Sequence, residues 1–406
     1  MLINLYANQL RLKSTELGIG LALIGVPLGM YLNYFFSVNF ISELIMFLCI
    51  LFIPEKRIIY SLKVMKLGWV INLILVLNIM YLFYSIYSGI YDYIPMHLFI
   101  LFFIFSFYFS DMNNFDLNYL IKVLFLFSSI CTLMGAYFIF SGKVVGDEAW
   151  EIRQNNENFA LEVFTISYGA VINLTTSLYL LISKKNKKYL MFLLILLDLY
   201  IIVFGGKRSP LLCVGVIFLI WFNYFKYIVK LKDVLFLIFL FFLIFIFLNF
   251  NDFFFFLLIS VLESLYLGFL VLLGFEGVYD QTGSATFRVG LRDFAFNLIN
   301  SDFELKNYIF GYGYMTQWLD NPVLQSFLDM GLMGFSLYIF VVIFYPIFKY
   351  INFIKNSEVT LFFTYCLYAI LTSFNSGHQY MSIKYIPVII LIYVIFSIKK
   401  QNGNLK

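Results

Sequence analysis

Two short segments of this 406-residue chain place arginines where they can bind an anion. Arg288 and Arg292 are four residues apart, a spacing that puts both on one face of a helix. Arg208 follows Lys207 in a Gly-Gly-Lys-Arg-Ser-Pro turn, whose glycines and helix start expose backbone N–H groups to a ligand. A guanidinium binds phosphate or carboxylate through two parallel hydrogen bonds, so these residues predict a phosphate-like ligand. Contact with lipid headgroups is the competing interpretation, and for Arg292 so is a pair with Asp293.

The composition indicates that these arginines belong to a membrane protein. Apolar residues make up 62% of the chain and charged residues 12%, whereas soluble domains have roughly 45–50% and about 25%. A water-facing fold of this size cannot bury so much apolar surface, which excludes a soluble enzyme, a disordered protein and a nucleic-acid binder. The four cysteines are scattered through apolar runs without a CxxC spacing, so they predict small apolar core residues rather than a metal site or disulfides.

We predict an all-α polytopic protein, with residues 1–406 forming one transmembrane domain of about twelve helices, because roughly 20 apolar residues cross a bilayer. The first span is interpreted as an uncleaved anchor. A further apolar stretch, Phe253–Phe275, contains Glu263 and is predicted to lie in the outer interface or to re-enter the membrane. The predicted spans are Leu17–Phe36, Val38–Ile53, Leu67–Ile90, Ile94–Ser110, Tyr119–Phe140, Phe159–Ile182, Tyr189–Phe204, Ser209–Phe225, Val234–Phe250, Gly331–Phe348, Val359–Phe374 and Ile383–Ile398.

The distribution of basic residues predicts the orientation. With both termini on the cytoplasmic side, 19 of the 27 lysines and arginines face inward, as the positive-inside rule favours. Residues 253–330 then form a large extracytoplasmic loop that carries short amphipathic helices. Phe287, Leu291, Phe294 and Leu298 mark the predicted apolar face of the helix that carries the two loop arginines.

Arginine is concentrated on the side that otherwise avoids positive charge. The chain has six arginines and 21 lysines, yet four of the eight outer cations are arginines, against two of the 19 inner ones. Because lysine is the usual cation of this chain, the outer arginines predict a specific use such as bidentate anion binding.

The order of motifs along residues 201–345 resembles the Wzy-type O-antigen polymerase and O-antigen ligase superfamily. Members of that superfamily carry a small-residue turn with an arginine, a second loop arginine, a Gly-x-Gly element, and a His-Asn segment that runs into a Glu-x-Gly-x-x-Gly span. The matching segments here are Gly205–Pro210, Thr286–Arg288, Ile309–Tyr314 and Asp320–Gly334.

The resemblance implies a polysaccharide polymerase of the bacterial cytoplasmic membrane with an extracytoplasmic active site. It would be a metal-independent glycosyltransferase without a cofactor, acting on undecaprenyl-pyrophosphate-linked oligosaccharide repeat units. Membrane lipids surround it, and a chain-length regulator and a flippase of the same pathway are possible partners. The resemblance assigns Arg288 to catalysis and Arg208, Lys207, Arg292 and Asn321 to the pyrophosphate and glycan. The aromatic turn Gly311, Tyr312 and Gly313 is assigned to the glycan, a plain interfacial turn being the alternative.

The catalytic base is the least determined part of the predicted site. Where the family has its histidine, this chain has Asp320, which is a substitute base, a positioning group or the cap of the next helix. His378, in the last outer loop, is the second candidate base, although a lone loop histidine is often incidental, and His97 is interpreted as structural. Gly331 and Gly334 are predicted to allow close helix packing.

Three other functions remain open at this stage. A ligase of the same superfamily would transfer a finished glycan to another lipid or a protein. A lipid-linked oligosaccharide flippase is disfavoured, because Glu43 and Asp198 are the only charged residues more than three residues inside a predicted span, and both are acidic. A structural membrane-assembly partner is the last alternative.

Overall fold

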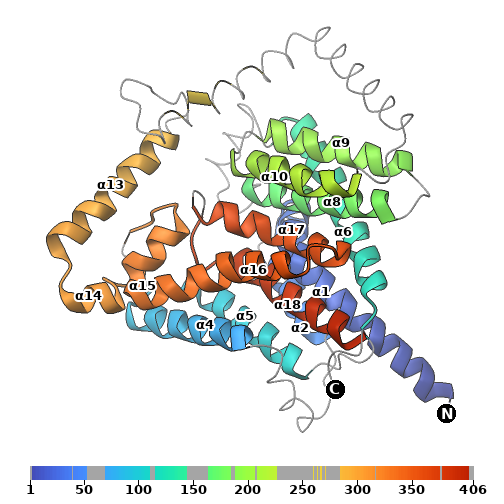
Figure 1. Ribbon diagram of the computed structural model, residues 1–406, viewed down its shortest axis with the longest axis horizontal. Helices are drawn as coiled ribbons and strands as arrows, with labels where there is room; N and C mark the ends of the chain where they lie inside the picture. The colour runs from blue at the N-terminus through green and yellow to red at the C-terminus, as the bar shows by residue number, and fades with distance from the viewer. Residues whose placement is uncertain are drawn as a thin grey trace.

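Every element in the described part of the chain is a helix, as predicted. The computed structural model describes residues 2–38, 40–52, 69–109, 115–143, 163–183, 188–205, 208–225, 284–315, 317–374 and 377–401, with five isolated positions between 259 and 270. The predicted span Val234–Phe250 and nearly all of Phe253–Phe275 lie outside these ranges. The helices are α1 (Leu2–Phe36), α2 (Ile41–Phe52), α4 (Trp69–Tyr87), α5 (Ile94–Phe109), α6 (Leu117–Phe140), α8 (Val163–Ser183), α9 (Lys188–Phe204), α10 (Arg208–Phe225), α13 (Ser284–Asp302), α14 (Leu305–Phe310), α15 (Pro322–Ile339), the π-helix η4 (Phe340–Phe344), α16 (Tyr345–Asn352), α17 (Ser357–Thr372) and α18 (Ser382–Gln401) (Figure 1).

Six segments of the described chain are long and apolar enough to cross a membrane. They belong to α1, α4, α6, α8, the continuous α15–η4–α16 helix and α18, and five shorter apolar helices accompany them. Eleven of the twelve predicted spans coincide with one of these helices. The fold is therefore a helical membrane-protein fold, and the count of twelve spans stays a prediction.

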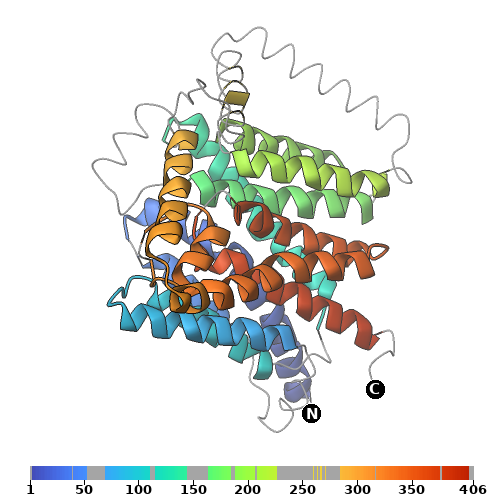
Figure 2. The ribbon, with the colours of Figure 1, turned by 60° about the vertical axis from the view of Figure 1, so that its left-hand side comes forward.

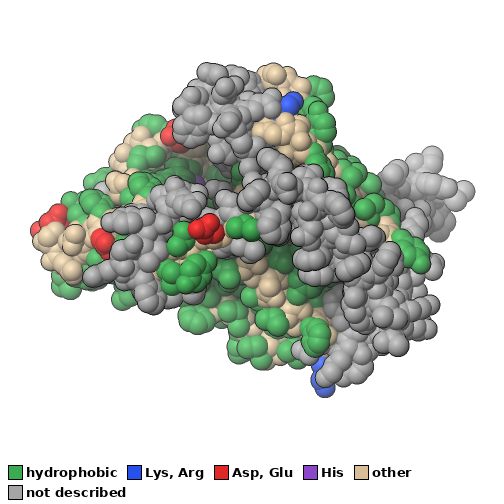
Figure 3. All heavy atoms as spheres, turned by 90° about the horizontal axis from the view of Figure 1, so that it is seen from above, with side chains coloured by type: hydrophobic (Ala, Val, Ile, Leu, Met, Phe, Trp, Pro, Cys, Tyr) green, Lys and Arg blue, Asp and Glu red, His purple; other side chains and the backbone are tan. Residues whose placement is uncertain are grey.

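The centre of the bundle is formed by α8, α17 and α18, which are almost entirely buried. Small polar side chains let these helices pack closely, and the buried threonines Thr175, Thr176, Thr364 and Thr372 bond backbone carbonyls of their own helices. Thr176 on α8, for example, bonds the Ile172 carbonyl and lies 2.8 Å from the Tyr365 hydroxyl on α17. The surrounding helices expose large apolar side chains, and few of the described side chains on the face shown in Figure 3 are charged. Such a surface suits hydrocarbon.

One buried carboxylate ties three of these helices together. Asp198 on α9 accepts hydrogen bonds from the Thr132 hydroxyl on α6 at 2.6 Å and from the Asn173 amide on α8 at 2.9 Å. Ser128 and Ser129 on α6 donate to the amide oxygen of Asn173. Because hydrocarbon offers no hydrogen bonds, the protein itself satisfies this polar group.

The helices α13 and α14 lie across one end of the bundle rather than along it (Figures 1 and 2). The start of α1 and the end of α18 lie away from that end. The junction between α14 and α15 depends on two glycines in the left-handed region, Gly311 at φ 87° and Gly331 at φ 63°. Gly331 kinks α15, and a Cβ there would lie 2.5 Å from the Ile309 carbonyl. The Tyr312 N–H completes the junction with a 2.7 Å bond to the Leu328 carbonyl.

The predicted packing role of Gly331 is thus confirmed, with a backbone turn as its partner instead of a neighbouring span. The space around Gly334 is also crowded, since a Cβ there would lie 2.4 Å from that of Met330.

We expect Gly331→Ala to destabilise the protein. A left-handed conformation costs an L-residue roughly 1–2 kcal/mol, and the clash with Ile309 adds to that. Gly290→Ala is the matched control, because Gly290 lies in α13 with open space around its Cβ position and should gain about 0.5–1 kcal/mol. Thermal unfolding of the detergent-purified proteins measures both, and a Gly331→Ala protein as stable as wild type would contradict the role of the junction.

Candidate functional site

The helix α13 turns its two arginines toward the bundle. Leu291 and Ala295 are buried against Leu319 and Leu328 in a small apolar cluster separate from the main core. Arg288 and Arg292 lie beside this packed strip. The predicted apolar face is therefore wrong in part, because Phe287 and Phe294 are 64% and 44% exposed. At a membrane surface an exposed aromatic ring is not penalised, so hydrophobicity alone did not identify the face that packs.

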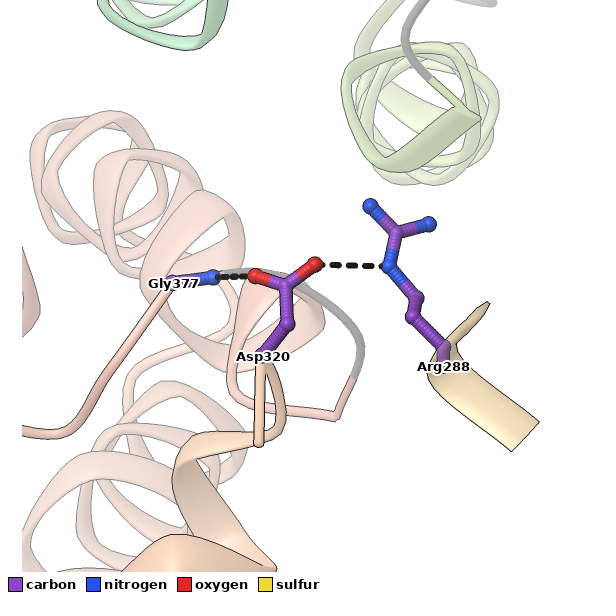
Figure 4. Close-up of polar contacts among 3 residues, drawn as sticks. All are labelled: Arg288, Asp320 and Gly377. Carbon is purple, nitrogen blue, oxygen red and sulfur yellow. Dashed lines mark hydrogen bonds and ion pairs between the residues drawn. The ribbon is translucent and has the colours of Figure 1, made fainter. Parts of the chain in front are cut away.

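Arg288 is held by Asp320, which is 32 residues away in sequence (Figure 4). Its Nε donates to Asp320 Oδ2 at 2.7 Å, and Oδ1 of the same carboxylate accepts the Gly377 N–H at 2.6 Å. Neither terminal nitrogen of the guanidinium is joined to Asp320 (Figure 4), and neither forms a hydrogen bond or ion pair within the described residues. Asp320 thus orients the arginine and leaves its bidentate edge open.

A cleft adjoins this pair. Arg292 contributes a second guanidinium, which lies 4.0 Å from the carboxylate of Asp293, and both of these side chains are well exposed. Asn321 caps α15 by accepting the Leu324 N–H at 3.0 Å, so the helix-cap interpretation of Asp320 is wrong. The cleft combines two arginines with a helix N-terminus, an arrangement that favours an anion. Its lining residues are Arg288, Val289, Arg292, Leu319, Asp320, Asn321, Leu324 and Phe374.

His378 is 6% exposed and packs among the rings of Tyr93, Trp318 and Tyr380. Burial, with smaller effects of Lys384 and His97, lowers the pKa of His378 to about 3. Its Nδ1 accepts the Tyr380 N–H at 3.2 Å, so the neutral ring carries its proton on Nε2. In this arrangement the imidazole can donate a hydrogen bond but cannot accept a proton without losing its bond to Tyr380.

The aromatic turn divides its two tyrosines between the surface and the core. Tyr312 is 43% exposed and stacks on Phe303, which stacks in turn on Phe327, each at 6.0 Å between ring centroids. Tyr314 is buried, with its hydroxyl 2.8 Å from Nε2 of His97. Gly311 packs against the α15 backbone, and Gly313 lies between the two tyrosines. Of the predicted glycan-binding turn, Tyr312 is the side chain available to a ligand, and His97 has the structural environment that was predicted.

Two predicted site residues cannot be placed next to this cleft. Lys207 lies outside the described residues, and only the backbone of Arg208 is described, as the first residue of α10. Their contribution to anion binding stays a prediction.

The sequence interpretation missed a buried polar group beneath the cleft and misplaced one lysine. Asp329, Gln325 and Gln379 are fully buried, and the side-chain amides of both glutamines donate to the Asp329 carboxylate. A lone acid in an apolar span is the signal that could have identified Asp329. Lys384, which the predicted topology puts among the eight outer cations at the start of the span Ile383–Ile398, is fully buried in α18, where its ammonium donates to the Thr372 hydroxyl. Lys384 is packed against α17, and a count of basic residues on each side of the membrane does not reveal such burial.

The chain matches no protein-family model, and no curated protein or solved structure is similar enough to it to count as a match. The functional assignment therefore rests on the motifs and on the geometry of the cleft.

We expect the pH dependence of stability to identify His378 as a buried neutral residue. The pKa of its ring falls from 6.5 in the unfolded chain to about 3 in the folded protein. Below pH 6.5 the unfolded chain binds a proton on His378 that the folded protein does not bind. The free energy of unfolding therefore falls toward acid by up to about 1.4 kcal/mol per pH unit. The Asn of His378→Asn can still accept from Tyr380 but does not titrate.

Melting temperatures of both proteins between pH 7.5 and 4.5 test this expectation. The variant should lose less stability toward acid than wild type. Parallel curves would show that the ring is protonated as readily in the folded state as in the unfolded one.

Proposed function

We propose that this protein is a polysaccharide polymerase that transfers a growing undecaprenyl-pyrophosphate-linked glycan onto a lipid-linked repeat unit at the outer face of the bacterial cytoplasmic membrane. The observation that carries the proposal is the Arg288 guanidinium. Asp320 fixes it through Nε, and its bidentate edge is open beside a cleft that contains Arg292 and the start of α15. The identity of the lipid and of the reaction follows from the motif resemblance.

The proposed reaction places negative charge where these arginines lie. A hydroxyl oxygen of the acceptor sugar attacks the anomeric carbon of the donor, and the bond from that carbon to the phosphate oxygen breaks. The bonding electrons leave with the lipid pyrophosphate, and the hydroxyl proton passes to a base or to water. Donors fixed before the reaction stabilise such developing charge without reorganisation. Arg288 stabilises the departing pyrophosphate, and Arg292 assists it.

The surroundings of the cleft suit an amphiphilic substrate. The exposed apolar faces of the bundle accommodate the polyprenyl chain, and the exposed ring of Tyr312 offers a stacking surface to a sugar. The helices α13 and α14 lie at the end of the bundle away from the start of α1 and the end of α18 (Figures 1 and 2). This arrangement agrees with cytoplasmic termini and an extracytoplasmic site.

Asp320 has a positioning role in this proposal. Each of its carboxylate oxygens already accepts one hydrogen bond, from Arg288 or from Gly377. It is also the single acidic residue that lines the cleft, so a remaining lone pair is the nearest described carboxylate acceptor for the proton of the attacking hydroxyl.

We expect Arg288→Lys to abolish polymer formation in a deletion strain, while the wild-type gene restores it. Arg288 pairs with Asp320 through Nε and keeps two parallel donors for an anion, which the single ammonium of lysine cannot do. The polymerisation rate should therefore fall on the order of 10²-fold. The measurement is the profile of lipid-linked and polymerised glycan, in which single repeats should accumulate.

Lys306→Gln is the control, because Lys306 is an exposed cation of α14 that pairs with Glu304 and does not line the cleft. Full-length polymer from Arg288→Lys would refute its catalytic role. In the strain without the protein, polymer that is made but not attached would indicate a ligase instead. Repeats retained on the inner leaflet would indicate a flippase.

We expect Asp320→Asn to lower the polymerisation rate and His378→Asn to leave it near wild type. The amide at position 320 would turn an N–H₂ group toward either Arg288 or Gly377, so one of the two bonds is lost. His378 has its Nδ1 lone pair occupied and is not expected to act as the base. Rates with purified enzyme in detergent test both expectations, and an inactive but folded His378→Asn protein would restore the histidine as a candidate base.

A further inference from the structure

Asp329 lies on α15, fully buried, and forms no hydrogen bond to a residue of the cleft. Its Oδ1 accepts the Gln325 amide at 2.8 Å. Its Oδ2 accepts the Gln379 amide at 2.9 Å and the Tyr380 hydroxyl. Donors from α15 and from the loop between α17 and α18 therefore converge on one side chain.

These contacts close a ring with the Arg288 anchor. On one side, Gln325 uses its carbonyl oxygen to accept the Leu319 N–H at 2.9 Å, and Leu319 directly precedes Asp320. On the other side, Gln379 lies two residues after Gly377, whose N–H donates to Asp320. Asp320 and Asp329 are thus joined twice, once through residues 319–325 and once through residues 377–379. The backbone that carries Asp320 and the Gly377 N–H that bonds its carboxylate therefore lie in segments that Asp329 holds.

A carboxylate is the group that this position requires. Three side-chain donors point at Asp329, and an ionised carboxylate accepts up to about four hydrogen bonds and donates none. The amide of Asp329→Asn, which has almost the same shape, would direct its N–H₂ group at one of these donors. Such a change opens the ring without creating a cavity.

We propose that Asp329 is a positioning residue that fixes the Arg288–Asp320 pair in its productive orientation. The inference rests on the proposed function for its chemical consequence and on the hydrogen-bonded ring for its geometry. Opening the ring lets the Asp320 carboxylate shift, and the guanidinium that it holds shifts with it. Since a displacement of about 1 Å in a positioned group costs on the order of 10²-fold in rate, kcat should fall while KM for the lipid-linked donor changes little.

A double-mutant cycle separates this role from general stabilisation. We expect Asp329→Asn to lower kcat at least tenfold, and Asp329→Asn combined with Asp320→Asn to be no slower than Asp320→Asn alone, because both act through one carboxylate. The matched control is Asp198→Asn, which changes another buried, hydrogen-bonded carboxylate that contacts no residue of the ring. Its effect on stability should not be accompanied by a loss of kcat in the folded fraction.

A second variant covers the case in which Asp329→Asn does not fold. Gln325→Met keeps the side-chain volume and removes only the arm that reaches Leu319. Gln325→Met should likewise cause no further loss of kcat when it is combined with Asp320→Asn. Multiplicative losses in these cycles, or wild-type kcat in both folded variants, would overturn the proposal.

Hydrogen–deuterium exchange of the purified proteins gives a readout that does not depend on catalysis. The amides of Leu319 and Gly377 should exchange at least tenfold faster in Asp329→Asn than in wild type, and at the wild-type rate in Asp198→Asn. Unchanged protection would overturn the positioning role even in an active enzyme. If wild type makes no polymer, the proposed function fails, and the exchange rates alone then decide whether Asp329 holds the pair.

Discussion

In the hydrocarbon core of a membrane no water is present to hydrogen-bond a polar side chain, so every buried polar group requires a partner within the protein. Many hydrogen bonds between and within the helices of this protein follow from that constraint. The central helices use serine and threonine hydroxyls that bond their own carbonyls, and Asp198 is shared among α6, α8 and α9. The same constraint, applied at one end of the bundle, produces the hydrogen-bonded ring around Asp329. Buried carboxylates thus have two roles here: Asp198 joins packed helices, and Asp329 holds the segments next to the cleft.

The ion pair between Arg288 and Asp320 at the cleft has a role other than stabilising the fold. Asp320 is partly exposed, so its ion pair with Arg288 contributes little to stability in itself. What the pair provides is direction, because Asp320 bonds the Nε of the guanidinium, while its terminal nitrogens have no partner among the described residues and Arg288 lines the cleft. An arginine anchored in this way has already lost side-chain freedom before an anion arrives. Binding and charge stabilisation then require less ordering, which is the physical meaning of preorganisation at such a site.

Three segments far apart in the sequence meet to build this end of the protein. The helix α13 brings Arg288, the turn before α15 brings Asp320, and the loop between α17 and α18 brings Gly377. The turn is fixed by the backbone contact between the Gly311 segment and Gly331, where a side chain at either glycine would collide with the opposite backbone. The position of Asp320 thus depends on two glycines that are packed against backbone.

The sequence by itself determined the class of this protein, the helices and the residues most worth attention. Apolar runs, helix starts and the bias of arginine against lysine are local properties, and all of them survive folding unchanged. The tertiary structure decided which of these residues meet. Asp320 became the partner of Arg288 and not a helix cap, Lys384 became a buried residue, and Phe287 turned outward from the face it was expected to pack. Pairing across 32 or 57 residues depends on how separate helices pack, and hydrophobicity does not encode it because lipid and protein interior accept the same apolar side chains.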